Sequence, residues 1–241
     1  MSIGTKLARR CDDSRRTRRY SRRVPLSTGQ RLLRFDRQLG ARFVAGADEA
    51  GRGPLAGPLV VAGVLLDYAM LRGHRVRPLA ELNDSKQVSP DDREELFHAV
   101  VASASAVSVR VIPAGEIDRV GLHKSNLGGL RAVLADLHPP AEACLVDGFR
   151  LGPAAPPHRA VVDGDTKSAA IAAASIVAKV VRDRVMRRID AMYPRYGFSS
   201  HVGYITPGHT LAVRLHGPCE QHRRSFNAKA YVDQSEFAAA L

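Results

Sequence analysis

The chain has 241 residues, and 45% of them are hydrophobic, so it is long enough to form one domain with a substantial core. It contains no stretch of about 18 apolar residues, and its N-terminus carries arginines where a secretory signal has an apolar core. We therefore expect neither a membrane span nor secretion. The three cysteines, Cys11, Cys144 and Cys219, lie far apart and form no CxxC pair, which favours a reducing, cytoplasmic location.

Much of the positive charge lies near the N-terminus. The formal net charge is +12, and residues 1–30 carry nine basic and two acidic side chains, which gives +7 there and leaves +5 for residues 31–241. We expect a basic, disordered extension over residues 1–30 and one folded domain over residues 31–241. The extension either attracts nucleic acid phosphates or is a passive tail, including one produced by a misassigned start codon.

The first predicted elements are a helix and two strands. Apolar residues recur at helical spacing over residues 31–39 and stop at Gly40. Two apolar runs follow, and they predict strands over residues 43–48 and 59–67. The second run is almost entirely apolar, so both faces of that strand should be buried.

Strands and helices alternate in the rest of the chain. Ser89-Pro90 is a strong helix start, and that helix should run to about residue 101. Further strands are expected over residues 107–112, 143–147 and 159–162, and further helices over residues 126–137, 169–192 and 207–215. A hairpin followed by alternating strands and helices predicts an α/β fold, with a mixed five-stranded sheet flanked by helices.

Acidic residues are expected at the ends of three strands. Asp48 and Glu49 close the first strand, Asp147 closes the fourth, and Asp165 closes the fifth. Neighbouring strands lie about 4.8 Å apart, so adjacent strand ends would bring these carboxylates close together. Four such charges need compensation, and hard divalent cations such as Mg²⁺ or Mn²⁺ are the usual partners of carboxylate oxygens. Each acid alone is also compatible with an ordinary turn, and Asp163 is an alternative to Asp165 as the acid of that segment.

The loop Gly51-Arg52-Gly53 follows the first two acids closely. Glycines allow a backbone to approach a ligand closely. The spacing GxGxxxG is one residue too long for a dinucleotide-binding loop, and no Lys-Ser/Thr pair follows for a Walker A loop. The loop is therefore interpreted as part of a site of another kind.

Other polar residues give weaker signals. A zinc site at His216, Cys219 and His222 is conceivable, but Pro218 interrupts the helix that would align them. Ser175, in a helix rich in alanine, either touches a substrate phosphate or bonds its own helix. Four basic side chains are candidate phosphate contacts, with solvated surface charge as the alternative: Lys86, Lys179, Arg182 and Arg223.

Taken together, these motifs resemble a known family. The segment from Asp48 to Pro58, DEAGRGPLAGP, looks like the signature opening of bacterial ribonuclease HII. The resemblance covers roughly residues 42–230 and continues in the right order through these segments: 82–86, 146–148, 164–165, 171–180, 182–183, 193–198, 201–204, 217–218 and 223–226.

The resemblance implies a fold and an activity. It implies a ribonuclease H-like catalytic domain over residues 31–241, with a C-terminal helical segment. The implied reaction is hydrolysis of the RNA strand in RNA–DNA hybrids and incision at single ribonucleotides in duplex DNA, with two Mn²⁺ or Mg²⁺ ions. The substrates would be those two nucleic acids, with no membrane partner, and we expect a monomer.

The resemblance also assigns residues. By position, Asp48, Glu49, Asp147 and Asp165 match the family's metal-binding and catalytic acids. The Gly51-Arg52-Gly53 loop matches the one that senses the ribose 2′-hydroxyl, the group that distinguishes RNA from DNA. Tyr204 matches the tyrosine that packs on the nucleotide at the RNA-to-DNA junction, and Lys86 and Ser175 are further candidates for substrate binding.

Two positions depart from the family pattern. Val202 and Gln87 stand where the family usually has lysines, so both changes remove positive charge near the expected nucleic acid. Two other classes of function stay open. One is a non-catalytic nucleic-acid-binding protein that uses the basic extension, and the other is a strand-transfer enzyme of the same fold class.

Overall fold

A mixed five-stranded sheet forms the centre of the molecule. The computed structural model describes residues 26–71, 77–82 and 88–231. The strand order is β3-β2-β1-β4-β5; β2 is antiparallel to both β1 and β3, and β4 is parallel to both β1 and β5. Their bounds are β1 Phe43–Ala50, β2 Leu59–Asp67, β3 Ala106–Ile112, β4 Ala143–Asp147 and β5 Arg159–Val161. The predicted mixed sheet is confirmed, and each strand lies within two residues of its expected bounds.

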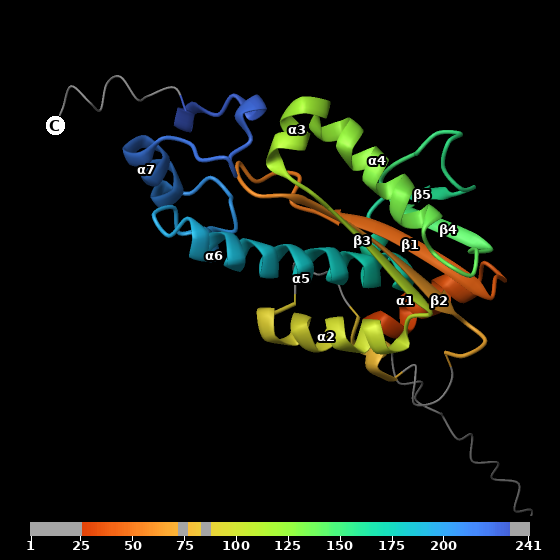
Figure 1. Ribbon diagram of the computed structural model, residues 1–241. Helices are drawn as coiled ribbons and strands as arrows, with labels where there is room; N and C mark the ends of the chain where they lie inside the picture. The colour runs from red at the N-terminus through yellow and green to blue at the C-terminus, as the bar shows by residue number, and fades with distance from the viewer. Residues whose placement is uncertain (1–25, 72–76, 83–87, 232–241) are drawn as a thin grey trace, which may run out of the picture.

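Helices cover both faces of the sheet (Figure 1). One face carries α1 (Thr28–Arg37), the short 3₁₀ helix η2 (Arg77–Glu81), α2 (Pro90–Ser103) and α5 (Ala169–Met192), and the other carries α3 (Ala114–Val120) and α4 (Leu122–Ala135). Every residue of β2 is buried, as predicted, because alternate side chains enter the two cores. Val60 and Val64 face α5, whereas Val61 and Leu65 face α4.

The long helix α5 lies unusually close to β1. A Cβ atom on Gly46 would stand 2.1 Å from the carbonyl carbon of Ala170, so only glycine allows this approach. The first turns of α5 are almost all alanine and are fully buried. As a result, the side chains of α5 reach the end of β1 where the acidic residues lie.

The C-terminal segment packs around the far end of α5 (Figure 1). It contains α6 (Phe198–His201), α7 (Pro207–His216) and the 3₁₀ turns η4 (Arg224–Phe226) and η5 (Lys229–Tyr231). Its core joins Met186 of α5 to Phe198 and Val213, and also to Leu55 from the loop after β1. The C-terminal segment therefore buries the loop that follows the acidic strand end.

Some helices begin earlier than the sequence predicted. Helix α1 starts at Thr28, because Ser27 accepts a hydrogen bond from the Gln30 amide and the Gln30 side chain bonds back to Ser27. This start lies before the boundary expected at residue 30. Helices α3 and α6 were not predicted at all. None of the helices in the described ranges is long and apolar enough to cross a membrane.

Candidate active site

The four predicted acids line one cavity. Its volume is about 320 Å³, and it is bounded by β1, β4, η3 (Gly164–Thr166), α5 and the loop after β1. The structure brings together nearly all the predicted site residues here: Asp48, Glu49, Gly51, Arg52, Gly53, Asp147, Asp165, Ser175, Lys179, Arg182 and Tyr204. Two further positions of interest, Lys86 and Gln87, lie outside the described residues.

The acids reach the cavity from different local structures. Asp48 and Glu49 lie within β1 rather than after it, so their side chains point to opposite faces of the sheet. Asp147 is the last residue of β4, the parallel neighbour of β1. Its carboxylate accepts a 2.7 Å hydrogen bond from the Gly164 amide, which ties β4 to η3.

Asp165 does not close a strand, so that prediction is wrong. Strand β5 ends at Val161, and Asp163 then adopts a left-handed conformation with φ of 51° that turns the chain into η3. Asp165 is buried in this turn, whereas Asp163 is exposed and does not line the cavity. Of these two aspartates, only Asp165 lines the cavity.

Burial raises the pKa of both acids of β1. The pKa of Asp48 is raised well above its ordinary value, chiefly by burial and then by the charges of Glu49 and Asp147, while Ser175 lowers it by bonding the carboxylate. Burial also raises the pKa of Glu49 to about 7, against the opposing effect of the Arg52 guanidinium. The Oε2 atom of Glu49 has no hydrogen-bond partner among the described residues. Ionised carboxylates so placed require a cation.

The donors fit a hard divalent cation in an open site. All four are carboxylates, the ligand type that Mg²⁺ and Mn²⁺ prefer. Within the described ranges, no three His, Cys, Asp or Glu side chains are arranged to hold a metal ion as they stand, so the fit rests on the type of donor and on the shared cavity. All four acids line the cavity, so a cation held there would share it with water and substrate oxygens.

The two glycines of the loop after β1 have different surroundings. Gly51 has a φ of 93°, and a Cβ atom there would stand 2.1 Å from Nε of Arg182. At Gly53, the nearest atom to such a Cβ would be Cε1 of Tyr204, at an ordinary 3.7 Å. Gly51 is therefore required by the fold, whereas Gly53 keeps space open inside the cavity.

Arg52 connects this loop to the acids. Its guanidinium lies 3.5 Å from a carboxylate oxygen of Glu49 and 4.8 Å from the centre of the Phe149 ring. The side chain is still 43% exposed, so it is reachable from the cavity.

Arg182 and Arg223 are not surface phosphate contacts, which corrects one sequence interpretation. They are 1% and 0% exposed, and both guanidinium groups donate to backbone carbonyls. Arg182 donates hydrogen bonds to the carbonyls of Ala56, Pro58 and Val202. Arginine is seldom fully buried, so no local pattern pointed to this role. Lys179, by contrast, lies at the cavity and pairs with Asp183 at 2.7 Å.

Asn126 lies beside the site, next to Glu49, and the sequence did not reveal this placement. It is fully buried on α4 beside Glu49, whose pKa it lowers. Neither polar atom of its side chain has a hydrogen-bond partner among the described residues. By lowering the pKa of Glu49, the neighbouring carboxamide favours the ionised carboxylate, the form that binds a cation.

Tyr204 lies on a loop supported by histidines. Its side chain is 48% exposed at the cavity, and its carbonyl is 2.9 Å from Nδ1 of His209. Nε2 of His209 lies 3.0 Å from Nε2 of His222, whose Nδ1 accepts a hydrogen bond from the Cys219 amide. These hydrogen bonds are structural. They count against the zinc hypothesis, because both ring nitrogens of His222 are engaged by His209 and by the Cys219 amide, while His216 is exposed.

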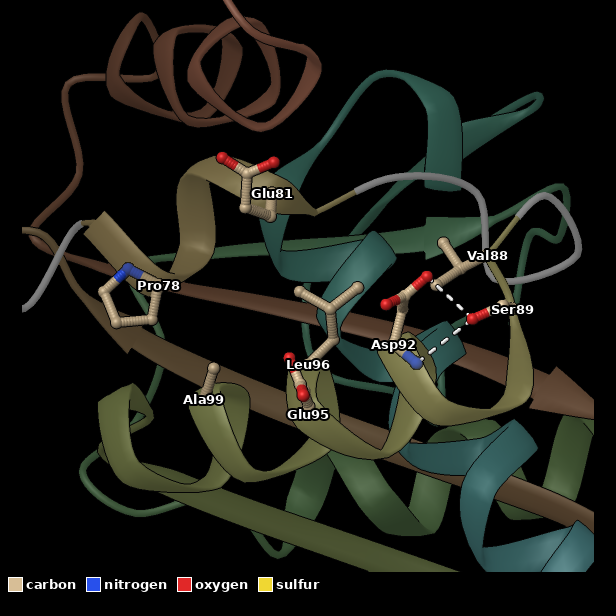
Figure 2. Close-up of a pocket in the computed structure, with 8 residues that line it drawn as sticks. All are labelled: Pro78, Glu81, Val88, Ser89, Asp92, Glu95, Leu96 and Ala99. Atoms are coloured by element: carbon tan, nitrogen blue, oxygen red, sulfur yellow. Dashed lines mark hydrogen bonds between the residues drawn. The ribbon is translucent and has the colours of Figure 1, made fainter.

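A larger cavity lies away from these residues, between η2 and α2 (Figure 2). Its volume is about 630 Å³, and its acids are Glu81, Asp92 and Glu95. Asp92 is engaged in capping α2, since its amide and its carboxylate both bond the Ser89 hydroxyl. None of the predicted site residues lines this cavity.

The fold and the carboxylate cavity define a class of protein. A mixed sheet that presents buried acids from its two central strands, beside a backbone loop and an exposed tyrosine, is typical of a metal-dependent nuclease of the ribonuclease H-like class. The family model for ribonuclease HII matches residues 45–229 of the chain. The chain belongs to the ribonuclease HII family, and it is a metal-dependent endoribonuclease.

Individual relatives agree with this assignment. The ribonuclease HII of Acidothermus cellulolyticus is 46% identical over 198 residues, which make up 81% of this chain and 63% of that relative. The crystal structure of ribonuclease H2 from Pyrococcus horikoshii OT3 has a TM-score of 0.68 at 26% identity and covers 81% of this chain and 99% of its own. A Bst-RNase HIII solved in complex with Mn²⁺ has a TM-score of 0.63 at 18% identity, and the similarity covers 86% of this chain and 73% of that one. The predicted ribonuclease H-like fold is confirmed.

Proposed function

We propose that the protein cleaves the RNA strand of RNA–DNA hybrids and incises duplex DNA on the 5′ side of single ribonucleotides, leaving a 3′-hydroxyl and a 5′-phosphate. The observation that carries this proposal is the shared cavity. Four acids suited to divalent metal and a backbone loop suited to reading a sugar line the same 320 Å³ space. Hydrolysis of the phosphodiester and recognition of the ribose therefore act on the same nucleotide.

The metal ligands are assigned to Asp48, Glu49, Asp147 and Asp165. Two divalent ions bound there would activate the attacking water and stabilise the leaving oxygen. The similar Bst-RNase HIII was solved with Mn²⁺ bound, which supports a divalent cation of this kind, and Mn²⁺ and Mg²⁺ are both proposed here. Ser175 holds Asp48 through its hydroxyl and is therefore assigned to orienting that carboxylate.

Substrate selection is assigned to the loop and to Tyr204. The backbone of Gly51-Arg52-Gly53 reads the 2′-hydroxyl, and the exposed ring of Tyr204 stacks on the nucleotide at the junction. Lys179 at the cavity supplies positive charge for a phosphate. Val202, next to this tyrosine loop, contributes no charge, so the affinity there is weaker than with the usual lysine. One copy of the chain contains every element required, and the protein acts as a monomer.

A duplex DNA with one internal ribonucleotide tests the proposal. In Mn²⁺ or Mg²⁺, the protein should nick it once, on the 5′ side of the ribonucleotide, and a matching all-deoxy duplex should stay intact. Asp48→Asn should lower the rate by about a thousandfold or more while retaining binding, because it removes a ligand charge but little volume. An intact ribonucleotide duplex with both ions, or full activity of Asp48→Asn, would refute the proposal.

A further inference from the structure

Arg223 holds the glycine loop from behind. Its buried guanidinium donates three hydrogen bonds to carbonyls, from Nε to Gly57 at 3.0 Å, from Nη1 to Arg52 at 3.1 Å and from Nη2 to Gly51 at 2.6 Å. Its own amide donates to the Leu55 carbonyl at 2.9 Å. The side chain of Arg223 therefore holds the carbonyls at Gly51, Arg52 and Gly57, while Arg182 holds those of Ala56 and Pro58.

These contacts determine where the loop amides point. In a planar trans peptide, the carbonyl and the following N–H point in opposite directions. Because the carbonyls of Gly51 and Arg52 face Arg223, the amides of Arg52 and Gly53 face the other way, toward the cavity that both residues line. Within the described residues neither amide donates a hydrogen bond. They form an adjacent pair of available donors, an arrangement that suits an electron-rich oxygen.

The choice of arginine is informative. Burying a guanidinium is unfavourable unless its donors are satisfied, and here all three bonds go to neutral carbonyls of one loop. The pKa of Arg223 is lowered to about 9 by burial and then by the nearby charge of Arg182. The Phe226 ring, centred 5.2 Å from the guanidinium, braces it further. A lysine would carry the same charge, but its single ammonium group lacks the planar fork of donors with which arginine reaches three carbonyls.

We propose that Arg223 is a positioning residue for ribonucleotide recognition. By holding the carbonyls of Gly51 and Arg52, it keeps the amides of Arg52 and Gly53 aimed at the 2′-oxygen of the bound ribose. Arg223 itself touches no substrate. This inference rests on the proposed function, because it concerns the loop that reads the ribose.

The test compares binding of two duplexes in EDTA, where no cleavage occurs. One duplex carries a single ribonucleotide and the other is all-deoxy, and both dissociation constants are measured by fluorescence anisotropy. The wild-type protein should prefer the ribonucleotide duplex. In Arg223→Lys this preference should fall by about fivefold or more, the value of about one hydrogen bond, while affinity for the all-deoxy duplex stays within about twofold.

A matched control separates positioning from general stability. Arg93 on α2 is also buried and donates to a backbone carbonyl, that of Val88, but it does not line the acidic cavity. Arg93→Lys should lower thermal stability without changing the preference. If Arg223→Lys does not fold, Phe226→Leu replaces it, since this variant removes the bracing ring and should weaken the preference about twofold to threefold.

The outcomes distinguish the two proposals. If the wild-type protein fails to nick a single-ribonucleotide duplex in Mn²⁺, the proposed function is wrong. If the wild type nicks and prefers this duplex but Arg223→Lys keeps the full preference, only the role of Arg223 is overturned. An equal loss of preference in Arg93→Lys would also overturn it.

Discussion

Gly51 and Gly53 are two residues apart, yet the structure gives different reasons for each. Gly51→Ala should destabilise the fold by about 2 kcal/mol or more, because φ is 93° and the new Cβ would meet the Arg182 side chain. Gly53→Ala should change stability by less than about 0.5 kcal/mol, since its Cβ would make only an ordinary contact with Tyr204. It should nevertheless reduce cleavage of a single-ribonucleotide duplex by about tenfold, because the methyl group enters the cavity.

Thermal unfolding and cleavage rates of both variants decide this prediction. A strongly destabilised Gly53→Ala protein, or one with wild-type activity, would show that the cavity space at this position is not needed for substrate.

The buried carboxylate of Glu49 is expected to lower the stability of the metal-free protein, because only one of its oxygens lies near the Arg52 guanidinium, at 3.5 Å. Its carboxylate is buried near Asp48 and Asp147, and Oε2 has no partner among the described residues. Glu49→Gln should therefore stabilise the metal-free protein by about 1 kcal/mol, or about 2–4 °C in melting temperature, while abolishing cleavage. Scanning calorimetry in EDTA measures the shift. Asp163→Asn, an exposed neighbour outside the cavity, serves as the control and should change neither property.

Individual residues show what the sequence could predict about the site. The sequence predicted that the four acids lie together, because each lies next to an apolar strand or a glycine turn, and all four line one cavity. Burial of Arg223 and the proximity of Asn126 to Glu49 depend on contacts between distant segments, and no local pattern encodes them. Asp165 was assigned to the site, but its predicted position at the end of a strand was wrong. The left-handed turn at Asp163, which places Asp165 in η3, depends on how β5 joins α5.

At the level of elements, two buried histidines should make the stability of the C-terminal segment sensitive to acid. His209 lies within hydrogen-bonding distance of the Tyr204 carbonyl and of His222. Burial lowers the pKa of both histidines, that of His222 to about 4, so both are neutral in the folded protein near pH 7. The unfolded chain takes up protons below about pH 6.5. The stability that these residues contribute is therefore complete above about pH 6.5 and is lost as the pH falls toward about 4.

Melting temperatures between about pH 4 and 8 check this dependence. The stability difference between the wild type and His222→Gln should be largest above about pH 6.5 and should shrink by several degrees toward acid pH. His216→Gln, which alters an exposed histidine of the same segment, serves as the comparison variant. A difference between the wild type and His222→Gln that grows toward acid pH would contradict the assignment of neutral, buried histidines.

Regular elements were predicted where burial imposes a clear pattern. The bounds of β2, β4 and α5 match the sequence prediction, because each is a long or nearly continuous apolar segment. Helices α3 and α6 have seven and four residues, too few for a recognisable period, so their formation depends on packing against the rest of the fold.

At the level of the whole molecule, charge is distributed unevenly along the chain. Residues 1–24 carry nine basic and two acidic side chains, so deleting them lowers the net charge from +12 to +5. We predict weaker binding of RNA–DNA hybrid at low salt and a shallower dependence of affinity on salt, because fewer counterions are released. The maximal cleavage rate should stay unchanged, since the deletion ends before α1.

Titrations of the hybrid at several salt concentrations measure this effect. A second variant, in which the nine basic residues are replaced by glutamine at full length, should behave like the deletion. An unchanged salt dependence in both variants would mean that the extension makes no contact with the substrate.

The bonds from Arg223 to the glycine loop span 166 to 172 residues of sequence. Because synthesis proceeds from the N-terminus, a nascent chain contains all four acids long before the residue that orients the loop has left the ribosome. The acids and the side chain that holds the loop are thus synthesised at different times. Under the role proposed for Arg223, discrimination between RNA and DNA requires that residue 223 has emerged. A translation product interrupted between residues 165 and 223 would carry the four acids without the side chain that holds the loop.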